Sequence, residues 1–336
     1  MAQLKIAYLG PAGTFTEIAA GQVTTGAELL PVASVTAAID AVLEGRADRA
    51  VVPIENSIEG GVSATSDALA VIGGVQIYGE YLVPVRFDLM AKPGTKLETI
   101  SAVLTHPVAY AQSRKWLEAK LSGHTHIPAA STAAAAKAMA DGADCDAVIA
   151  ATGAAEIYGL EILASDIGEN KEAQTRFIEI GRSGKPQPKT GHDKTSVIVE
   201  LPDDRPGGLL EMLEQFAARG VNLSRLESRP IGDRFGRYRF NIDAEGHLDD
   251  EAIAETLMGL HRFSPKLIFL GSYARADKAE SNHQGNNADG AYQSAKKWLD
   301  DLRNEISTFS ALFLIEKTTS ITSPTGSPSS CMAAGL

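Results

Sequence analysis

Short apolar runs alternate with alanine-rich helical patterns between Lys5 and Gly181. The runs are rich in Val, Ile and Leu, which predicts buried strands, whereas the alanine-rich segments end at Gly or at a polar break, which predicts helices. Strands and helices that alternate in this way predict a parallel α/β sheet with helices on both faces. The runs that we interpret as strands are KIAYLG, RAVVPIE, SAVLTH and DAVIA.

The chain makes two long extended passages between these α/β series, at Val75–Ala91 and at Leu160–Phe177. Two crossings predict two α/β lobes joined by a double hinge, with a ligand-binding cleft between the lobes. Polar side chains at the carboxyl ends of parallel strands would face such a cleft. A Pro-, Gly- and Lys-rich segment follows at residues 183–194, and its composition is typical of a linker.

The pattern changes after this linker. Within residues 195–275 the apolar periodicity predicts the order βαββαβ, which defines a ferredoxin-like unit. Such a unit leaves one face of its sheet free, and we expect that face to pair with a second copy. Residues 276–336 are predicted to be a flexible tail that contains one amphipathic helix and ends in a disordered Ser-, Thr-, Pro- and Gly-rich segment. The apolar positions of that helix are Tyr292, Ala295, Trp298, Leu299 and Leu302.

Composition narrows the range of partners. The chain has 336 residues, of which 44% are hydrophobic and 22% charged, and this is typical of a globular protein with a buried core. The formal net charge is -11, from 31 basic and 42 acidic residues without a cluster of Lys and Arg, so we expect neither nucleic acid nor anionic membrane as a partner. We expect a cytoplasmic protein, because no signal-peptide pattern, membrane-length apolar run or disulfide framework is present.

Polar residues follow four of the predicted strands. Each set stands between an apolar strand and a helix, where side chains are open to the cleft and where the helix N-terminus can bind an anion. Each set alone could equally be a capping turn, but four that converge on one cleft favour a binding site. The residues are Thr14, Glu55, Asn56, Ser57, Thr105, Gln112, Ser131 and Thr132.

A further polar set stands at the start of the predicted strand FIEIG. Thr175, Arg176 and Phe177 place a hydroxyl, a cation and an aromatic ring where a rigid scaffold holds side chains that a ligand can reach. The alternative interpretation is a plain strand start with a solvated arginine.

The sequence gives little support for metal or covalent chemistry. The seven histidines are scattered, and the close pair His124 and His126 lies in a predicted edge strand without nearby cysteine or carboxylate ligands, so we expect no metal site. No nucleophile elbow for a serine hydrolase is found. Cys145 stands next to aspartates, whose charges would raise the pKa of its thiol and make it a poor nucleophile.

The motifs GPAGTFTE, VPIENSIEG, THPVAYAQ and TRF, followed by GGLL and ESRP, resemble those of prephenate dehydratases that carry a C-terminal ACT regulatory domain. The resemblance spans about residues 4–275. It implies an α/β fold with two parts: a two-lobed catalytic domain, like a type II periplasmic binding protein, and a ferredoxin-like βαββαβ ACT domain. The implied bounds are 1–182 for the catalytic domain, with lobe one at about 1–80 and 160–182 and lobe two at about 81–159, and 195–275 for the ACT domain.

The resemblance also implies an activity. Members of the family remove CO₂ and water from prephenate to give phenylpyruvate, on the route to phenylalanine, and this carbon–oxygen lyase (hydro-lyase) reaction needs no cofactor. In that family the threonine of TRF is closely tied to catalysis, which points to Thr175. Asn56 and Gln112 match cleft residues of the family, and Thr105 stands where some members have serine.

These roles lead to a hypothesis about the reaction. We expect the Thr175 hydroxyl to donate a hydrogen bond to the leaving hydroxyl of the substrate. Arg176, together with backbone N–H groups near Gly13 and Gly60, is expected to neutralise the substrate carboxylates. Phe177 is expected to pack against either the substrate ring or the hinge.

The ACT domain is expected to bind L-phenylalanine at a homodimer or homotetramer interface and so to control the active site allosterically. Glycine is needed where backbone approaches a ligand closely. The family has GALL where this chain has GGLL, so Gly208 replaces an alanine. The residues expected at this site are Gly207, Gly208, Leu209, Leu210, Asn222, Leu223, Glu227 and Ser228. A dimerisation module without ligand is the alternative.

Two rival interpretations concern the whole chain. The same chemistry could act on arogenate, which carries an amino acid side chain in place of the pyruvyl group. A non-catalytic protein that binds and senses a small molecule is the other rival, because a fold alone does not define a function. The intact Thr175-Arg176-Phe177 motif favours the enzyme.

Overall fold

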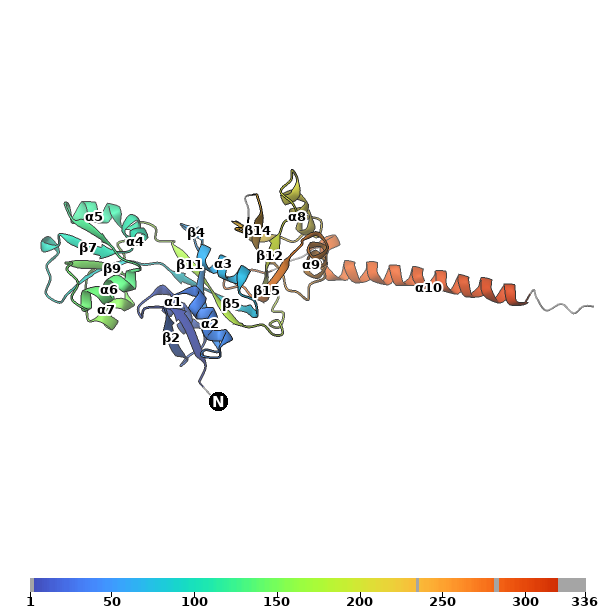
Figure 1. The fold of residues 1–336 in the computed structure, drawn as a ribbon, viewed down its shortest axis with the longest axis horizontal. Coiled ribbons are helices and arrows are strands. Elements are labelled where there is room, and N and C mark those ends of the chain that lie inside the picture. Colours follow the sequence, from blue (N-terminus) through green and yellow to red (C-terminus); the bar gives the residue numbers. More distant parts are fainter. Residues whose placement is uncertain (1–2, 234–235, 281–283, 320–336) are drawn as a thin grey trace, which may run out of the picture. The chain divides into compact units, whose positions relative to one another are not determined.

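The computed structural model describes residues 3–233, 236–280 and 284–319 (Figure 1). The chain divides into two compact units, Met1–Asn282 and His283–Leu336. The first unit contains three sheets, one for each predicted lobe and one for the predicted ferredoxin-like unit.

The first sheet holds the strands that carry Asn56 and Thr175. Its order is β2-β1-β3-β11-β5, and β4 pairs with β3. β1 is parallel to β2 and β3, as predicted, but β11 is antiparallel to both β3 and β5, so the sheet is mixed. The strands are β1 (Lys5–Leu9), β2 (Glu28–Val32), β3 (Arg49–Asn56), β4 (Gly60–Gly61), β5 (Val75–Pro84) and β11 (Gln174–Arg182). The helices are α1 (Phe15–Val23), α2 (Val35–Leu43) and α3 (Ser63–Val71).

Both faces of this sheet are apolar because both are covered. Tyr8 and Phe177 are buried with residues of α1, whereas Ala7 and Ile178 are buried with residues of α2 and α3. Successive residues of one strand therefore belong to different layers of the protein. This alternation decides where the functional side chains of β11 point.

The second sheet has the order β10-β6-β9-β7-β8. Its strands are β6 (Asp88–Ala91), β7 (Ala102–Thr105), β8 (Thr125–Pro128), β9 (Ala147–Ala150) and β10 (Glu161–Ala164). Its helices are η1 (Leu97–Thr99), α4 (Pro107–Gln112), α5 (Arg114–Lys120), α6 (Thr132–Ala140) and α7 (Gly153–Tyr158). Because β10 pairs with β6, the chain returns to the first sheet after residue 164 and not at residue 160 as we expected.

The third sheet and its helices have the predicted order βαββαβ. The strands are β12 (Asp193–Glu200), β13 (Leu223–Pro230), β14 (Tyr238–Glu245) and β15 (Leu267–Ala274), and the helices are α8 (Gly208–Ala217) and α9 (Glu251–Phe263). The strands are antiparallel in the order β13-β14-β12-β15. The ferredoxin-like prediction is confirmed.

One face of this third sheet packs on the first sheet. Ile198, Leu270 and Tyr273 belong to the same buried cluster as residues of α2, α3 and β5. A Cβ added at Gly271 would lie 2.4 Å from the carbonyl oxygen of Ile77, so glycine lets β15 cross close to β5. The face that we expected to meet a second copy is therefore covered by the catalytic part of the same chain.

The second unit contains η2 (Gly285–Asn287) and the long helix α10 (Asp289–Thr319). This helix includes the predicted amphipathic segment and continues beyond it. The Ser- and Thr-rich end that we predicted to be disordered lies largely in residues 320–336, outside the described part of the chain.

Candidate active site

Thr175 and Asn56 lie opposite each other on adjacent strands, β11 and β3. The Asn56 side-chain nitrogen Nδ2 donates to the Thr175 hydroxyl Oγ1 over 2.9 Å. Thr175 is 9% exposed, so the hydroxyl lies in a largely dehydrated position. The sequence placed both residues in one site, and the structure brings them into direct contact.

The Asn56 amide has a defined orientation. Its oxygen Oδ1 accepts backbone N–H groups of Ile58 at 2.9 Å and of Glu59 at 3.2 Å, in the turn that follows β3. An oxygen that accepts two N–H groups leaves Nδ2 to face Thr175. Thr175 Oγ1 is therefore the acceptor in this pair, and its own proton is available for another partner.

Ser57 joins the end of β3 to the start of β11 by two hydrogen bonds. Its Oγ accepts the backbone N–H of Gln174 at 3.0 Å, and its own N–H donates to the Gln174 carbonyl at 2.9 Å. These bonds fix the start of β11 next to the end of β3. Ser57 is exposed, so its hydroxyl can also meet a ligand.

Several of the predicted cleft residues are helix caps. Thr14 accepts the N–H of Glu17 as the N-cap of α1, and Ser131 accepts the N–H of Ala134 as the N-cap of α6. Thr132 is the first residue of α6 and is half-buried. The capping interpretation and the binding interpretation coincide here, because a capped helix N-terminus still presents backbone N–H groups.

Two residues of the second lobe are placed differently. Thr105 is fully buried, and its hydroxyl donates to the Ile149 carbonyl at 2.8 Å, so it ties β7 to β9 and does not face a ligand. Gln112 is half-buried at the end of α4, and its backbone carbonyl accepts the N–H of Glu169 at 2.7 Å. Gln112 thus lies beside the loop that leads into β11.

Contacts also join the first two sheets. The Tyr158 hydroxyl of α7 donates to the Ala12 carbonyl at 2.7 Å, and the rings of Phe15 and Phe87 meet edge to face with centroids 5.9 Å apart. The Gly13 N–H donates to the Glu17 carboxylate at 2.5 Å. That N–H has a partner within the protein, which does not support the role that we expected for it.

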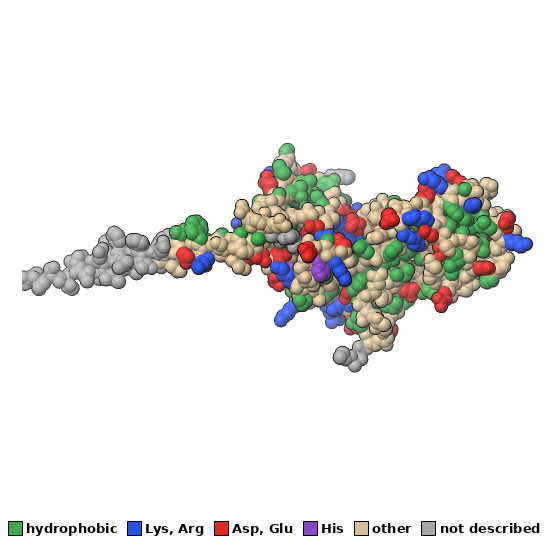
Figure 2. Space-filling view, turned by 180° about the vertical axis from the view of Figure 1, so that it is seen from behind, with side chains coloured by type: hydrophobic (Ala, Val, Ile, Leu, Met, Phe, Trp, Pro, Cys, Tyr) green, Lys and Arg blue, Asp and Glu red, His purple; other side chains and the backbone are tan. Residues whose placement is uncertain are grey.

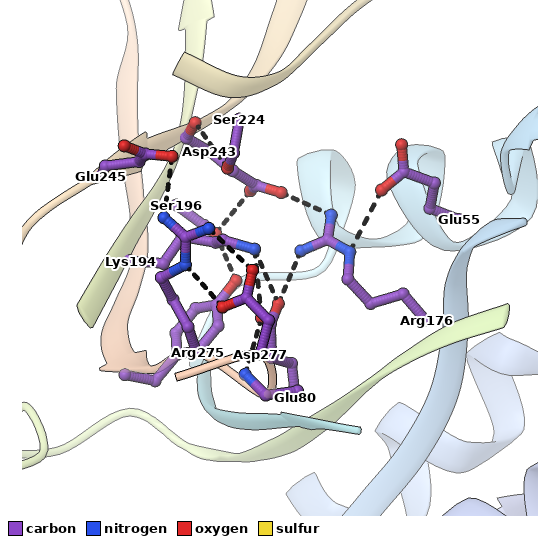
Figure 3. Close-up of polar contacts among 12 residues, drawn as sticks. Glu55, Glu80, Arg176, Lys194, Ser196, Ser224, Asp243, Glu245, Arg275 and Asp277 are labelled. Carbon is purple, nitrogen blue, oxygen red and sulfur yellow. Dashed lines mark hydrogen bonds and ion pairs between the residues drawn. The ribbon is translucent and has the colours of Figure 1, made fainter. Parts of the chain in front are cut away.

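The guanidinium of Arg176 does not lie where we expected it from the sequence. Its guanidinium lies on the face of β11 opposite Thr175 and donates to the carboxylates of Glu55, Glu80 and Asp243, at 3.2, 2.8 and 2.5 Å (Figure 3). It is 7% exposed, so it is neither a solvated arginine nor placed to hold a substrate carboxylate next to Thr175. Glu55 points to this second face too, because it alternates with Asn56.

Phe177 lies on the Thr175 face of β11. It is 2% exposed and packs with Ile6, Tyr8 and the alanines of α1. The structure places it in the core of the first lobe, below the strand end that carries Thr175. We expected this ring to pack against the substrate ring or the hinge, and its contacts with the core of the first lobe bear out neither expectation.

The charged cluster around Arg176 was not found from the sequence. Lys194 Nζ donates to both oxygens of Glu80, at 3.1 and 3.0 Å, and Ser196 Oγ donates to Asp243 at 2.6 Å (Figure 3). Burial alone would raise the pKa of Asp243, but the charges of Arg176, Arg225 and Lys194 outweigh it and lower that pKa to about 2. A charged residue in the middle of an apolar strand, as in VQIYGEYLV and FNIDA, is the signal that could have indicated the cluster.

The glycine–leucine segment of the ACT domain starts α8. Gly207 has a φ of +84° as the N-cap, which favours glycine, whereas a Cβ on Gly208 would meet the Asp203 carbonyl at an ordinary 3.5 Å. An alanine would fit at Gly208. Leu209 and Leu210 are 40% and 60% exposed.

The other predicted effector residues divide between two faces of β13. Leu223 and Ser228 pair with Ala244 and Phe240 of β14 and so lie on the face of the sheet opposite the one that carries Asp243. Glu227 points the other way, where its carboxylate accepts the Ser66 hydroxyl of α3 at 3.0 Å. Glu227 therefore faces the catalytic domain. Asn222 is exposed just before β13.

The described residues contain no group of three or more His, Cys, Asp and Glu side chains that could hold a metal ion. Burial, together with the nearby aspartates, raises the pKa of the Cys145 thiol, which agrees in direction with our expectation. Over the described part of the face in Figure 2, acidic and basic side chains are interspersed. Among the helices of the described residues, none is long and apolar enough to span a membrane.

Two α/β lobes, of which the first carries a hydroxyl–amide pair at its strand ends and packs on a ferredoxin-like unit, define a two-lobed catalytic domain with a regulatory domain attached. The prephenate dehydratase family model matches residues 6–185, and the ACT domain model matches residues 195–262. The chain belongs to the prephenate dehydratase family. This confirms the family, the fold class and the dehydratase function that the resemblance implied.

Individual relatives agree with this assignment. A prephenate dehydratase of Corynebacterium glutamicum is 40% identical over 301 residues, which cover 88% of this chain and 95% of that protein. The structure of a prephenate dehydratase from Arthrobacter aurescens in complex with L-Phe is 48% identical, with a TM-score of 0.85 over 90% of this chain and all of that one. A structure described as GqqA, a novel type of quorum quenching acylase, is 31% identical, with a TM-score of 0.72 over 81% of this chain and 98% of that one.

Proposed function

We propose that the chain converts prephenate to phenylpyruvate with Thr175 as the hydrogen-bond donor to the departing hydroxide. The observation that carries this proposal is the direction of the Asn56–Thr175 hydrogen bond. Since Nδ2 donates to Oγ1 over 2.9 Å, the Thr175 proton is free for the substrate. The low exposure of Thr175 strengthens any hydrogen bond that its hydroxyl makes.

The proposed reaction can be written with side chains of this chain and solvent. The bond from the ring to its carboxylate breaks, and its electron pair moves into the ring. The C–O bond across the ring then breaks, so CO₂ and hydroxide leave and the ring becomes aromatic. Threonine is too weak an acid for full proton transfer, so its contribution is a hydrogen bond to the developing hydroxide, which becomes water by taking a proton from a hydronium ion or a buffer acid in the solvent. One donor of this kind contributes about 10²–10³ in kcat.

The two carboxylates of prephenate need donors, and backbone N–H groups at the starts of α1 and α6 are our candidates. Both helices have a hydroxyl N-cap, Thr14 and Ser131, and are long enough for their dipoles to favour an anion. Thr132, Gln112 and Ser57 are the further residues that we propose near the substrate.

We propose that L-phenylalanine binds the ACT domain between two copies of the chain. Support comes from the Arthrobacter relative, which was solved with L-Phe, and from apolar side chains exposed on α8 and the edge strand β13. Leu209, Leu210 and Leu226 are 40%, 60% and 43% exposed, and an edge strand with such neighbours favours pairing with another copy. A homodimer or homotetramer follows from this proposal, and the effector would lie near Gly207 and Ser228.

The finer assignments remain predictions. The hydro-lyase class follows from the loss of water, and a cytoplasmic location is predicted from the cysteine usage. Arogenate remains the rival substrate. The relative described as an acylase makes a direct product assay necessary, because similar folds carry different activities.

The test is phenylpyruvate release from prephenate by the full chain, with arogenate as a second substrate. Thr175→Ser should keep most of the activity, whereas Thr175→Ala should lose about two to three orders of magnitude in kcat. Thr99→Ala is the control, because that hydroxyl caps an exposed turn and donates to the Lys96 carbonyl. An active Thr175→Ala variant would refute the role of this hydroxyl, and turnover of arogenate alone would change the substrate. Added L-phenylalanine tests effector control in the same assay.

A further inference from the structure

The face of β11 that lies opposite Thr175 is bound to the ACT domain. Arg176 is adjacent to Thr175, so their Cα atoms are about 3.8 Å apart. Its guanidinium donates to Glu80 of the neighbouring strand β5 and to Asp243 of β14, at 2.8 and 2.5 Å. The side chains of Arg176, Glu80 and Asp243 are all at most 8% exposed. The catalytic strand is thus joined to the regulatory sheet by a buried ion pair one residue from the reactive hydroxyl.

The ACT side of this ion pair is also held in place. Asp243 Oδ1 accepts the Ser196 hydroxyl at 2.6 Å (Figure 3). Ser196 in turn shares a hydrogen bond of 2.7 Å with the Tyr273 hydroxyl. Lys194 of β12 donates to Glu80 from the same side. Three of the four ACT strands therefore contribute to the position of the Asp243 carboxylate, so a rearrangement of the sheet would shift the Arg176 guanidinium.

The ACT domain also lies close to β4, the short strand that pairs with the end of β3. Glu227 of β13 contacts Ser66, and a Cβ added at Gly61 would lie 2.5 Å from the Glu227 carboxylate. Gly61 belongs to β4, which pairs with the end of β3 that carries Asn56. β11 is therefore in contact with β14, and the end of β3 is linked to β13 through β4.

We propose that Arg176 is a positioning residue, which through Asp243 sets the distance between Thr175 and Asn56 and transmits the state of the ACT domain to the active site. A hydrogen bond of 2.9 Å weakens with a shift of a few tenths of an ångström, and catalytic geometry is sensitive to such shifts. The transmission half of this proposal rests on the proposed effector control. The positioning half does not.

The test compares Asp243→Asn with Asp67→Asn in the full chain. Asp67 of α3 accepts Arg229 and Arg239 at 2.7 Å each, so it forms an ion pair between the same two domains without touching β11. Two quantities are measured: kcat and KM for prephenate without effector, and the Kd of L-phenylalanine with and without saturating phenylpyruvate. The ratio of the two Kd values reports the coupling between the sites, whatever its sign.

Asp243→Asn should lower kcat about tenfold with KM within about twofold, and should bring the Kd ratio to about one. Asp67→Asn should keep both quantities close to those of the wild type. Equal losses in the two variants would overturn the proposal, because the effect would then belong to the interface in general. Wild-type kcat and coupling in Asp243→Asn would overturn it too.

A milder variant covers the case in which Asp243→Asn does not fold, as judged by circular dichroism. Ser196→Ala removes one hydrogen bond from Asp243 and should lower kcat about threefold, in the same direction. An unchanged kcat in a folded Ser196→Ala variant would then refute the proposal. If the wild type binds no L-phenylalanine, the effector proposal and the transmission half fail together, and the kcat comparison decides the positioning half separately.

Discussion

The Asn56→Asp substitution tests the direction of the central hydrogen bond with the smallest change in shape. The side-chain oxygen that accepts the N–H groups of Ile58 and Glu59 is kept, so the turn after β3 keeps its hydrogen bonds. The atom that faces Thr175 becomes an oxygen. At 2.9 Å it would accept the Thr175 proton and remove that proton from the leaving hydroxide.

Two costs follow, and they act on different kinetic constants. Losing one preorganised donor to a developing anion lowers kcat by about 10²–10³, or about 3–4 kcal/mol. The new negative charge also repels the dianionic substrate, and at an assumed ~5 Å and an effective dielectric of ~20 one pair of charges contributes about 3 kcal/mol. The second cost raises KM. The loss in kcat should become smaller at low pH, because the protonated carboxyl group of the variant can again donate to Thr175.

The assay is phenylpyruvate formation from prephenate between pH 4 and pH 8. Asn170→Asp is the control, because Asn170 also accepts a backbone N–H in the loop before β11, from Glu172 at 2.9 Å, but is exposed. We expect the control to keep its kcat and Asn56→Asp to recover kcat as the pH falls. Wild-type kcat in Asn56→Asp at neutral pH would refute the reasoning about the direction of the bond.

Three further predictions follow from other parts of the structure. The pKa of Asp243 lies at about 2, below its ordinary 3.8. The ionised carboxylate therefore contributes about 2 kcal/mol to the free energy of unfolding above pH 4, and this contribution is lost as the pH falls toward 2. The free energy of unfolding of Asp243→Asn, measured with urea, should depend less on pH in that range. Gly61→Ala should lower the Tm by a few degrees, because its methyl group would displace the Glu227 carboxylate from its contacts with Ser66 and Arg225. Gly73→Ala, with open space around it, should leave the Tm unchanged. Cys145 should react with a thiol reagent at pH 8 at least about tenfold more slowly than free cysteine, because burial raises its pKa, and a fast reaction would contradict this.

The sequence placed Asn56 and Thr175 in one cleft but did not predict that they pair. Asn56 ends β3 and Thr175 lies at the start of β11, and the two residues meet because β11 is antiparallel to β3. The direction of the hydrogen bond could not be predicted, because it depends on two backbone N–H groups of the following turn.

Arg176 was misplaced because the motif was considered as a unit of three adjacent residues. Side chains alternate along a strand, so Arg176 cannot share a face with Thr175 and Phe177. Its partner Asp243 lies in another domain, 67 residues further along the chain. A single sequence contains no signal that joins such distant positions, although a charge within an apolar strand indicates that some partner exists.

The shared core of the first and third sheets has a consequence for how this chain can be divided. Ile54, Leu69 and Ile77 lie in one buried cluster with Leu270 and Tyr273, so the first sheet with its helices and the ACT domain share a hydrophobic core. A fragment cut after the catalytic lobes would expose this apolar surface to water and leave buried charges without partners. Truncations designed for expression should therefore keep the ACT domain together with the first sheet, within the compact unit Met1–Asn282.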